Sequence, residues 1–89
     1  MIRAHIFYSG TVQRVGFRFV TQRHAQTLDL NGWVKNLPDG RVEICAEGSR
    51  ENIERLCGGL DQHFAGYIHK KDIEFSETQG HAQGFRIAG

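Results

Sequence analysis

The 89-residue sequence contains few cysteines, a single proline and no long hydrophobic run. Its two cysteines, Cys45 and Cys57, are too few for a disulfide framework, so we expect a reducing, cytoplasmic environment. No apolar stretch approaches the roughly 18 residues of a membrane-spanning helix, which predicts no membrane partner. The first residues alternate in polarity as a strand does, and they lack the layout of a secretory signal peptide.

The sequence also lacks an excess of either charge. Eleven Lys and Arg residues stand against ten Asp and Glu residues, which leaves a formal net charge of +1 at pH 7. Proteins that bind nucleic acids by neutralising phosphates carry a stronger basic excess or a clustered basic face, so no nucleic-acid partner is expected. The length suits one domain, residues 1–89, and we expect it to be a monomer.

The pattern of apolar residues predicts two helices among four or five strands. Apolar residues at three-and-four spacing predict one helix over residues 17–28 and a second one, capped by Ser49, that continues to Phe64. Alternating residues and turn residues predict strands over residues 1–10, 32–36, 41–47, 67–77 and 84–87.

The order strand, helix, strand, strand, helix, strand is that of the split βαβ arrangement. It predicts an α+β, ferredoxin-like βαββαβ sandwich, with two helices on one face of an antiparallel sheet of four or five strands. In that arrangement the first two strands run parallel with the third between them. The loop after Gly10 and the strand end at Asn36 are then expected at the same edge, about 10 Å apart.

The loop over residues 10–18 leaves a strand and enters a helix directly. Such a loop exposes successive backbone N–H groups, and the helix dipole adds positive potential at the same place. Arg18, in the first helical turn, can direct its guanidinium fork into this concavity and bind a phosphoryl group bidentately. On spacing alone, however, the simpler interpretation of Arg18 as a surface charge and of Asn36 as a turn-capping residue is favoured.

Three segments form two linked motifs: GTVQRVGFR at residues 10–18, then LNGWVKN at 30–36 together with DGRVE at 39–43. These motifs resemble those of the acylphosphatase family, and the resemblance covers essentially the whole chain. The resemblance implies a hydrolase that cleaves the carboxyl–phosphate bond of small acyl phosphates to a carboxylate and inorganic phosphate. It also implies that the reaction uses no metal, no cofactor and no covalent intermediate.

The resemblance implies roles for individual residues as well. Arg18 is similar in position to the family's phosphate-binding catalytic arginine, and Asn36 to the asparagine that holds the attacking water. The phosphate cradle is implied to consist of the backbone amides of Gln13, Arg14, Val15 and Gly16.

Arg14 departs from the family pattern, which usually has glycine at that position of the loop. Glycine there indicates either a positive φ or a close approach of the backbone to the phosphate. A bulky residue in a left-handed conformation costs about 1–2 kcal/mol. Arg14 therefore either strains the cradle or points outward over its mouth and attracts dianionic substrates.

Two other functions fit parts of the sequence. RNA-recognition motifs share this element order, but their aromatic residues stand on a central strand, whereas residues 14–20 are predicted loop and helix. A non-catalytic phosphate- or ligand-binding domain of the same fold, as in larger carbamoyl-transferring maturation proteins, is the other alternative. The presence of both Arg18 and Asn36 favours the enzyme. The five histidines form no metal-binding pattern, so no metal site is expected.

Overall fold

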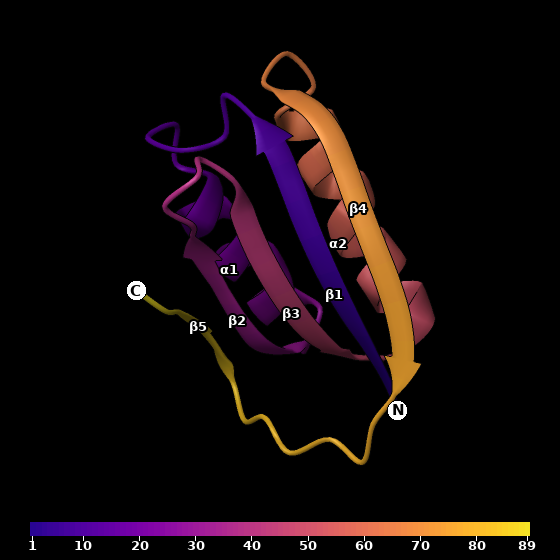
Figure 1. Ribbon diagram of the computed structural model, residues 1–89. Helices are drawn as coiled ribbons and strands as arrows, with labels where there is room; N and C mark the ends of the chain where they lie inside the picture. The colour runs from indigo at the N-terminus through magenta and orange to yellow at the C-terminus, as the bar shows by residue number, and fades with distance from the viewer.

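The computed structural model describes residues 1–89, and its elements follow the predicted order with ends shifted by at most one residue where a boundary was predicted. Figure 1 shows the strands in one sheet with both helices on the same face. The elements are β1 (Ile2–Gly10), α1 (Phe17–Thr27), β2 (Asn31–Asn36), β3 (Val42–Gly48), α2 (Arg50–His63), β4 (Ile68–Glu77) and β5 (Phe85–Ile87). The predicted ferredoxin-like α+β fold is confirmed.

The sheet has the strand order β4-β1-β3-β2-β5. The four long strands pair antiparallel, whereas β5 pairs parallel with β2, so the sheet is mixed rather than wholly antiparallel. The parallel pairing arises because β4 ends where β2 begins, and the chain crosses that end of the sheet before running alongside β2 (Figure 1). β1 and β2 run parallel on either side of β3, which brings Gly10 and Asn36 to the same end of the sheet.

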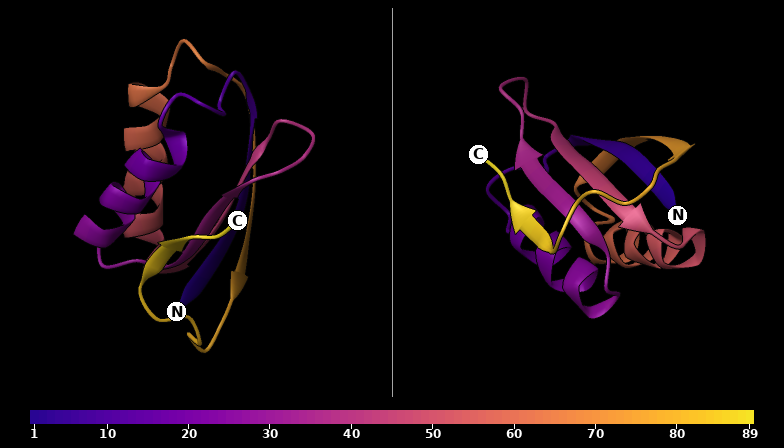
Figure 2. Two further views of the ribbon diagram at one scale, coloured as in Figure 1. Left: turned by 90° about the vertical axis from the view of Figure 1, so that its left-hand side faces the viewer. Right: turned by 90° about the horizontal axis from the view of Figure 1, so that it is seen from below.

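The core lies between the sheet and the two helices, which form two layers in Figure 2. Strand periodicity buries one face of β1, and helical periodicity buries one stripe of each helix. The inward-facing residues include Ala4, Ile6 and Tyr8 of β1, Phe17, Thr21 and Ala25 of α1, and Ile53, Leu56 and Leu60 of α2. The side chain of Ser49 accepts a hydrogen bond from the Asn52 N–H at 3.1 Å, which confirms the predicted cap of α2.

The crossing segment between β4 and β5 is held by Glu47, which is only 2% exposed. Arg3 donates to Oε2 of Glu47 through Nε and Nη2 at 3.0 and 2.8 Å, and the Ala82 N–H donates to Oε1 at 3.2 Å. Burial by itself raises the pKa of Glu47, but these hydrogen bonds outweigh it and hold the pKa below its ordinary value. Glu47 thus fixes the crossing that delivers β5 to the edge of β2.

We expect Glu47→Gln to lower the free energy of unfolding at pH 7 by about 1–2 kcal/mol, because it removes the charge from buried hydrogen bonds. The pKa of Glu47 is lower in the folded protein than in the unfolded chain, where it is about 4.3. The ionised carboxylate therefore stabilises the fold in full above about pH 4.3, and this stabilisation is lost as pH falls through the folded pKa. Urea unfolding of the variant should therefore show a shallower loss of stability below about pH 5 than the wild type.

The matched control for this experiment is Glu54→Gln. Glu54 pairs with Arg50 at 3.5 Å on the exposed side of α2, where such pairs contribute little. Equal effects of the two substitutions would contradict the anchoring role of Glu47.

Candidate functional site

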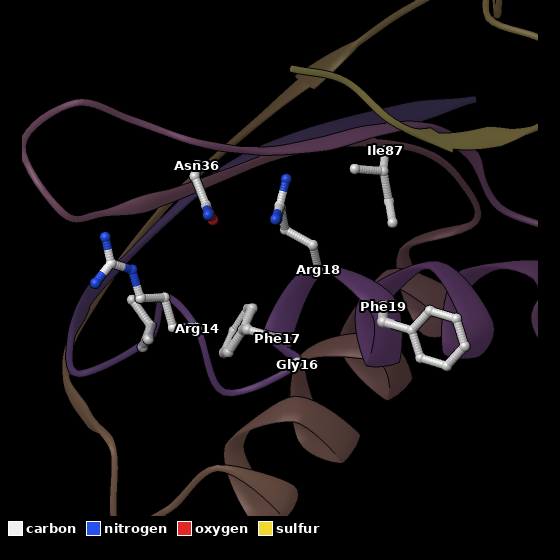
Figure 3. A pocket seen from close by; sticks show the side chains of 8 residues that line it. Arg14, Gly16, Phe17, Arg18, Phe19, Asn36 and Ile87 are labelled. Carbon is white, nitrogen blue, oxygen red and sulfur yellow. The ribbon is translucent and has the colours of Figure 1, made fainter.

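A cavity of about 190 Å³ opens at the end of the sheet where β1 and β2 finish (Figure 3). Ligand pockets for drug-sized molecules usually measure about 300–1,000 Å³, so this one suits a small substrate group. Its lining comes from the loop after β1, the first turn of α1 and the ends of β2 and β5. The lining residues are Val12, Arg14, Gly16, Phe17, Arg18, Phe19, Asn36 and Ile87.

The loop begins at Gly10, where β1 passes very close to the start of β4. Gly10 has φ +127°, and a Cβ atom there would lie 2.3 Å from the carbonyl oxygen of Tyr67, so only glycine fits. The Thr11 N–H donates to that same carbonyl at 2.9 Å. Val12 is then buried in the core. These contacts fix the direction in which the chain enters the cradle.

The side chain of Gln13 ties the other side of the loop to the turn between β2 and β3. Its Nε2 donates to the carbonyl oxygens of Leu37 and Arg41 at 2.8 and 2.9 Å. The family resemblance implies only a backbone role for Gln13, whereas its side chain also positions the loop. Nothing local predicts it, because its partners lie 24 and 28 positions further along the chain.

The loop presents a row of unpaired backbone donors. The N–H groups of Gln13, Arg14, Val15 and Gly16 donate to no carbonyl oxygen and no side chain. Gly16, at φ +82°, is the N-cap of α1, and the first N–H groups of a helix have no partner within it. Left-handed residues among ordinary ones form anion-binding concavities, and the helix N-terminus adds positive potential.

Arg14 combines the strained backbone of one alternative with the exposed side chain of the other, and its attraction of dianionic substrates stays a prediction. Its backbone is left-handed, with φ +67°, so the loop carries the strain that a glycine would avoid. Its side chain is nevertheless exposed and lines the cavity, and no carboxylate pairs with it. Arg14 therefore adds a positive charge at the rim at the expense of backbone strain.

Arg18 and Asn36 both face the cavity, as Figure 3 shows. Arg18 pairs with no Asp or Glu side chain, and its Nη1 lies 3.5 Å from the backbone oxygen of Gly89, at the long limit of a hydrogen bond. Asn36 lies two residues after the buried Val34, so it points to the helix-covered side of β2. Its Oδ1 is buried and accepts no hydrogen bond. Buried acceptors are nearly always paired, and this one has no partner within the chain. Because Asn36 lines the cavity, a donor bound there can supply the missing hydrogen bond.

Phe19 and Ile87 complete the lining. Phe19 falls outside the apolar stripe of α1 that the core buries, and it borders the cavity instead. Ile87 was not anticipated, because β5 reaches this edge only through the crossing that Glu47 anchors.

The remaining reactive side chains lie elsewhere. Cys45 and Cys57 are both free, and burial raises the pKa of each thiol, so both stay protonated near neutrality. No group of three or more His, Cys, Asp or Glu side chains is arranged to hold a metal ion. None of the helices has the length and apolarity required to span a membrane.

Comparison with known proteins shows the family of this chain. The sequence matches the family model described as Acylphosphatase over residues 4–87. The chain belongs to the acylphosphatase family. An acylphosphatase of Natronomonas pharaonis is 51% identical, with 97% of this chain and 94% of that protein covered. The crystal structure of acylphosphatase from Bacillus subtilis matches with a TM-score of 0.91 at 31% identity, over the whole of both chains. The predicted family and the prediction of an acylphosphatase enzyme are confirmed.

The same fold also occurs inside a longer protein. HypF from T. kodakarensis matches with a TM-score of 0.84 at 34% identity, over all of this chain but only 12% of that one. The acylphosphatase fold is thus used both alone and within a larger chain.

The strain at Arg14 is measurable by comparing two substitutions. Arg14→Ala removes the side chain but keeps a Cβ in the left-handed conformation, whereas Arg14→Gly removes both. We expect the glycine variant to be more stable than the alanine variant by about 1 kcal/mol in urea unfolding. A glycine variant that is no more stable than the alanine variant would mean that Arg14 occupies its φ without strain.

Proposed function

We propose that the protein hydrolyses the carboxyl–phosphate bond of small acyl phosphates by direct, in-line attack of water. In this proposal Asn36 holds the water, while the loop over residues 11–18 and the Arg18 guanidinium bind the phosphoryl group. The proposal is carried by one observation. The cavity is lined by Arg14 and Gly16, whose backbone N–H groups are unpaired, by Arg18, which has no Asp or Glu partner, and by Asn36, whose buried amide oxygen accepts no hydrogen bond.

The cradle meets the main demand of phosphoryl transfer. The transition state is loose and spreads negative charge over three equatorial oxygens, so catalysis depends on positioning and on donors aimed at that charge. The amides of residues 13–16 and the fork of Arg18 supply such donors from fixed positions. Removing one well-aimed donor typically costs about 10²–10³ in kcat.

The leaving group explains why no acid is required. A carboxylic acid has a pKa near 4, so the carboxylate departs without protonation. Asn36 has no basic group near neutrality, and its role is to orient a water molecule towards phosphorus. A loose transition state needs little activation of the nucleophile, so orientation suffices.

The decisive experiment is steady-state hydrolysis of benzoyl phosphate by the wild type, Arg18→Ala and Asn36→Ala. We expect Arg18→Ala to lower kcat/KM by about 10²–10³, and to weaken inhibition by inorganic phosphate. Asn36→Ala should lower kcat by about tenfold to a hundredfold and leave phosphate inhibition unchanged, because Asn36 orients water and does not bind the phosphoryl group. Arg23→Ala, one turn further along α1 and exposed, is the control and should match the wild type.

Each outcome separates one part of the proposal. A wild type that hydrolyses neither benzoyl nor acetyl phosphate, yet binds inorganic phosphate, would indicate the non-catalytic phosphate-binding alternative. An active wild type with an unimpaired Asn36→Ala variant would remove the water-orienting role and leave the phosphate cradle intact.

The pH dependence of kcat provides a second test. No lining residue carries a group that titrates near neutrality, since the only ionisable side chains among them are Arg14 and Arg18. We expect kcat to change little between about pH 5 and pH 8, apart from ionisation of the substrate. A bell-shaped profile near neutrality would instead require a histidine in the mechanism.

A further inference from the structure

Two large hydrophobic side chains are exposed at the rim of the cavity. Phe19 is 58% exposed and Ile87 is 37% exposed, and both line the cavity. Core packing does not account for Phe19, because it lies about 200° around the helix from the buried Phe17. Both border the same cavity, so apolar surface is available there to a bound ligand.

The backbone around both residues is fixed by the fold. Phe19 follows Arg18 directly in the first turn of α1, so the helix fixes the directions in which the two side chains leave the backbone. Ile87 is opposite Val34 in the parallel pairing of β5 with β2, and the Ala88 N–H donates to the Val34 carbonyl at 2.8 Å. The strand that ends at Asn36 therefore also positions Ile87.

The side chain of Arg18 divides the cavity into two ends. In Figure 3, Arg14 and Asn36 lie on one side of Arg18, and Phe19 and Ile87 lie on the other. One end thus carries a charge and the unpaired amide oxygen, and the other end carries apolar surface.

In-line displacement relates these two ends to the substrate. The attacking and leaving oxygens lie on opposite sides of phosphorus, and the water is held at Asn36 in the proposed mechanism. The carboxylate oxygen and its acyl group therefore leave on the side away from Asn36, where Phe19 and Ile87 stand.

We propose that Phe19 and Ile87 form a subsite for the acyl group, which gives the enzyme a preference for acyl phosphates with an aromatic or branched apolar acyl group. This inference rests on the proposed function. An aromatic acyl group can pack against the Phe19 ring and remove apolar surface of both from water, whereas an acetyl group offers only one methyl group.

The test compares kcat/KM for benzoyl phosphate with kcat/KM for acetyl phosphate, because their ratio cancels effects on the phosphate cradle. We expect Phe19→Ser to lower this ratio about fivefold to tenfold relative to the wild type, and Ile87→Ser to lower it less. Phe19→Leu should keep most of the ratio, since it retains apolar surface. Arg23→Ser, also exposed on α1 but outside the cavity, is the matched control and should leave the ratio unchanged.

Inhibition by inorganic phosphate is measured in the same variants and should stay at the wild-type value, because phosphate has no acyl group. A wild-type ratio in Phe19→Ser, with hydrolysis of both substrates intact, would overturn the acyl subsite and leave the proposed function standing. A wild type that hydrolyses neither substrate would overturn the proposed function itself.

Discussion

The close passage of β1 against β4 at Gly10 determines the rest of the site. A side chain at this position would collide with the Tyr67 carbonyl, so the strands approach only because the residue is glycine. From there the loop is fixed by the hydrogen bond from Thr11 and by the side chain of Gln13. With both sides of the loop held by contacts outside it, the amides between them remain free to bind a ligand. In the proposed mechanism, a cradle preorganised in this way needs no rearrangement during the reaction.

The balanced charge of the protein and the positive potential of the site are compatible because the potential is local. It comes from the N-terminus of α1, from the free loop amides and from Arg14 and Arg18, neither of which pairs with an Asp or Glu side chain. Elsewhere, most arginine and lysine side chains pair with acidic ones, as Arg3 does with Glu47, and only Arg23 and Arg86 do not. The proposed phosphoryl site therefore has positive potential of its own without a basic protein around it.

In the loop, the conformation of Arg14 lowers stability, whereas at the crossing between β4 and β5 the contacts of Glu47 both stabilise the fold and shape the cavity. The left-handed backbone of Arg14 costs stability and places a guanidinium at the rim. At the other end of the sheet, buried Glu47 stabilises the crossing and thereby delivers Ile87 to the cavity. The proposed acyl subsite thus depends on an ion pair that lies far from it along β3, while the proposed phosphate end depends on contacts within a few residues of the loop.

Local patterns in the sequence were sufficient to predict the element order, the cap at Ser49, and the family, through the motifs that contain Arg18 and Asn36. Periodicity, turn residues and short motifs each involve only a few neighbouring residues, so they can be recognised without the fold. Only the tertiary structure decided the parallel pairing of β5, the anchoring of the loop by Gln13, and the place of Ile87 in the cavity. Each of these joins residues more than twenty positions apart, and their meeting depends on the packing of the whole chain. The conformation of Arg14 lies between the two: the motif posed the alternatives, and the folded loop has left-handed backbone together with an exposed side chain.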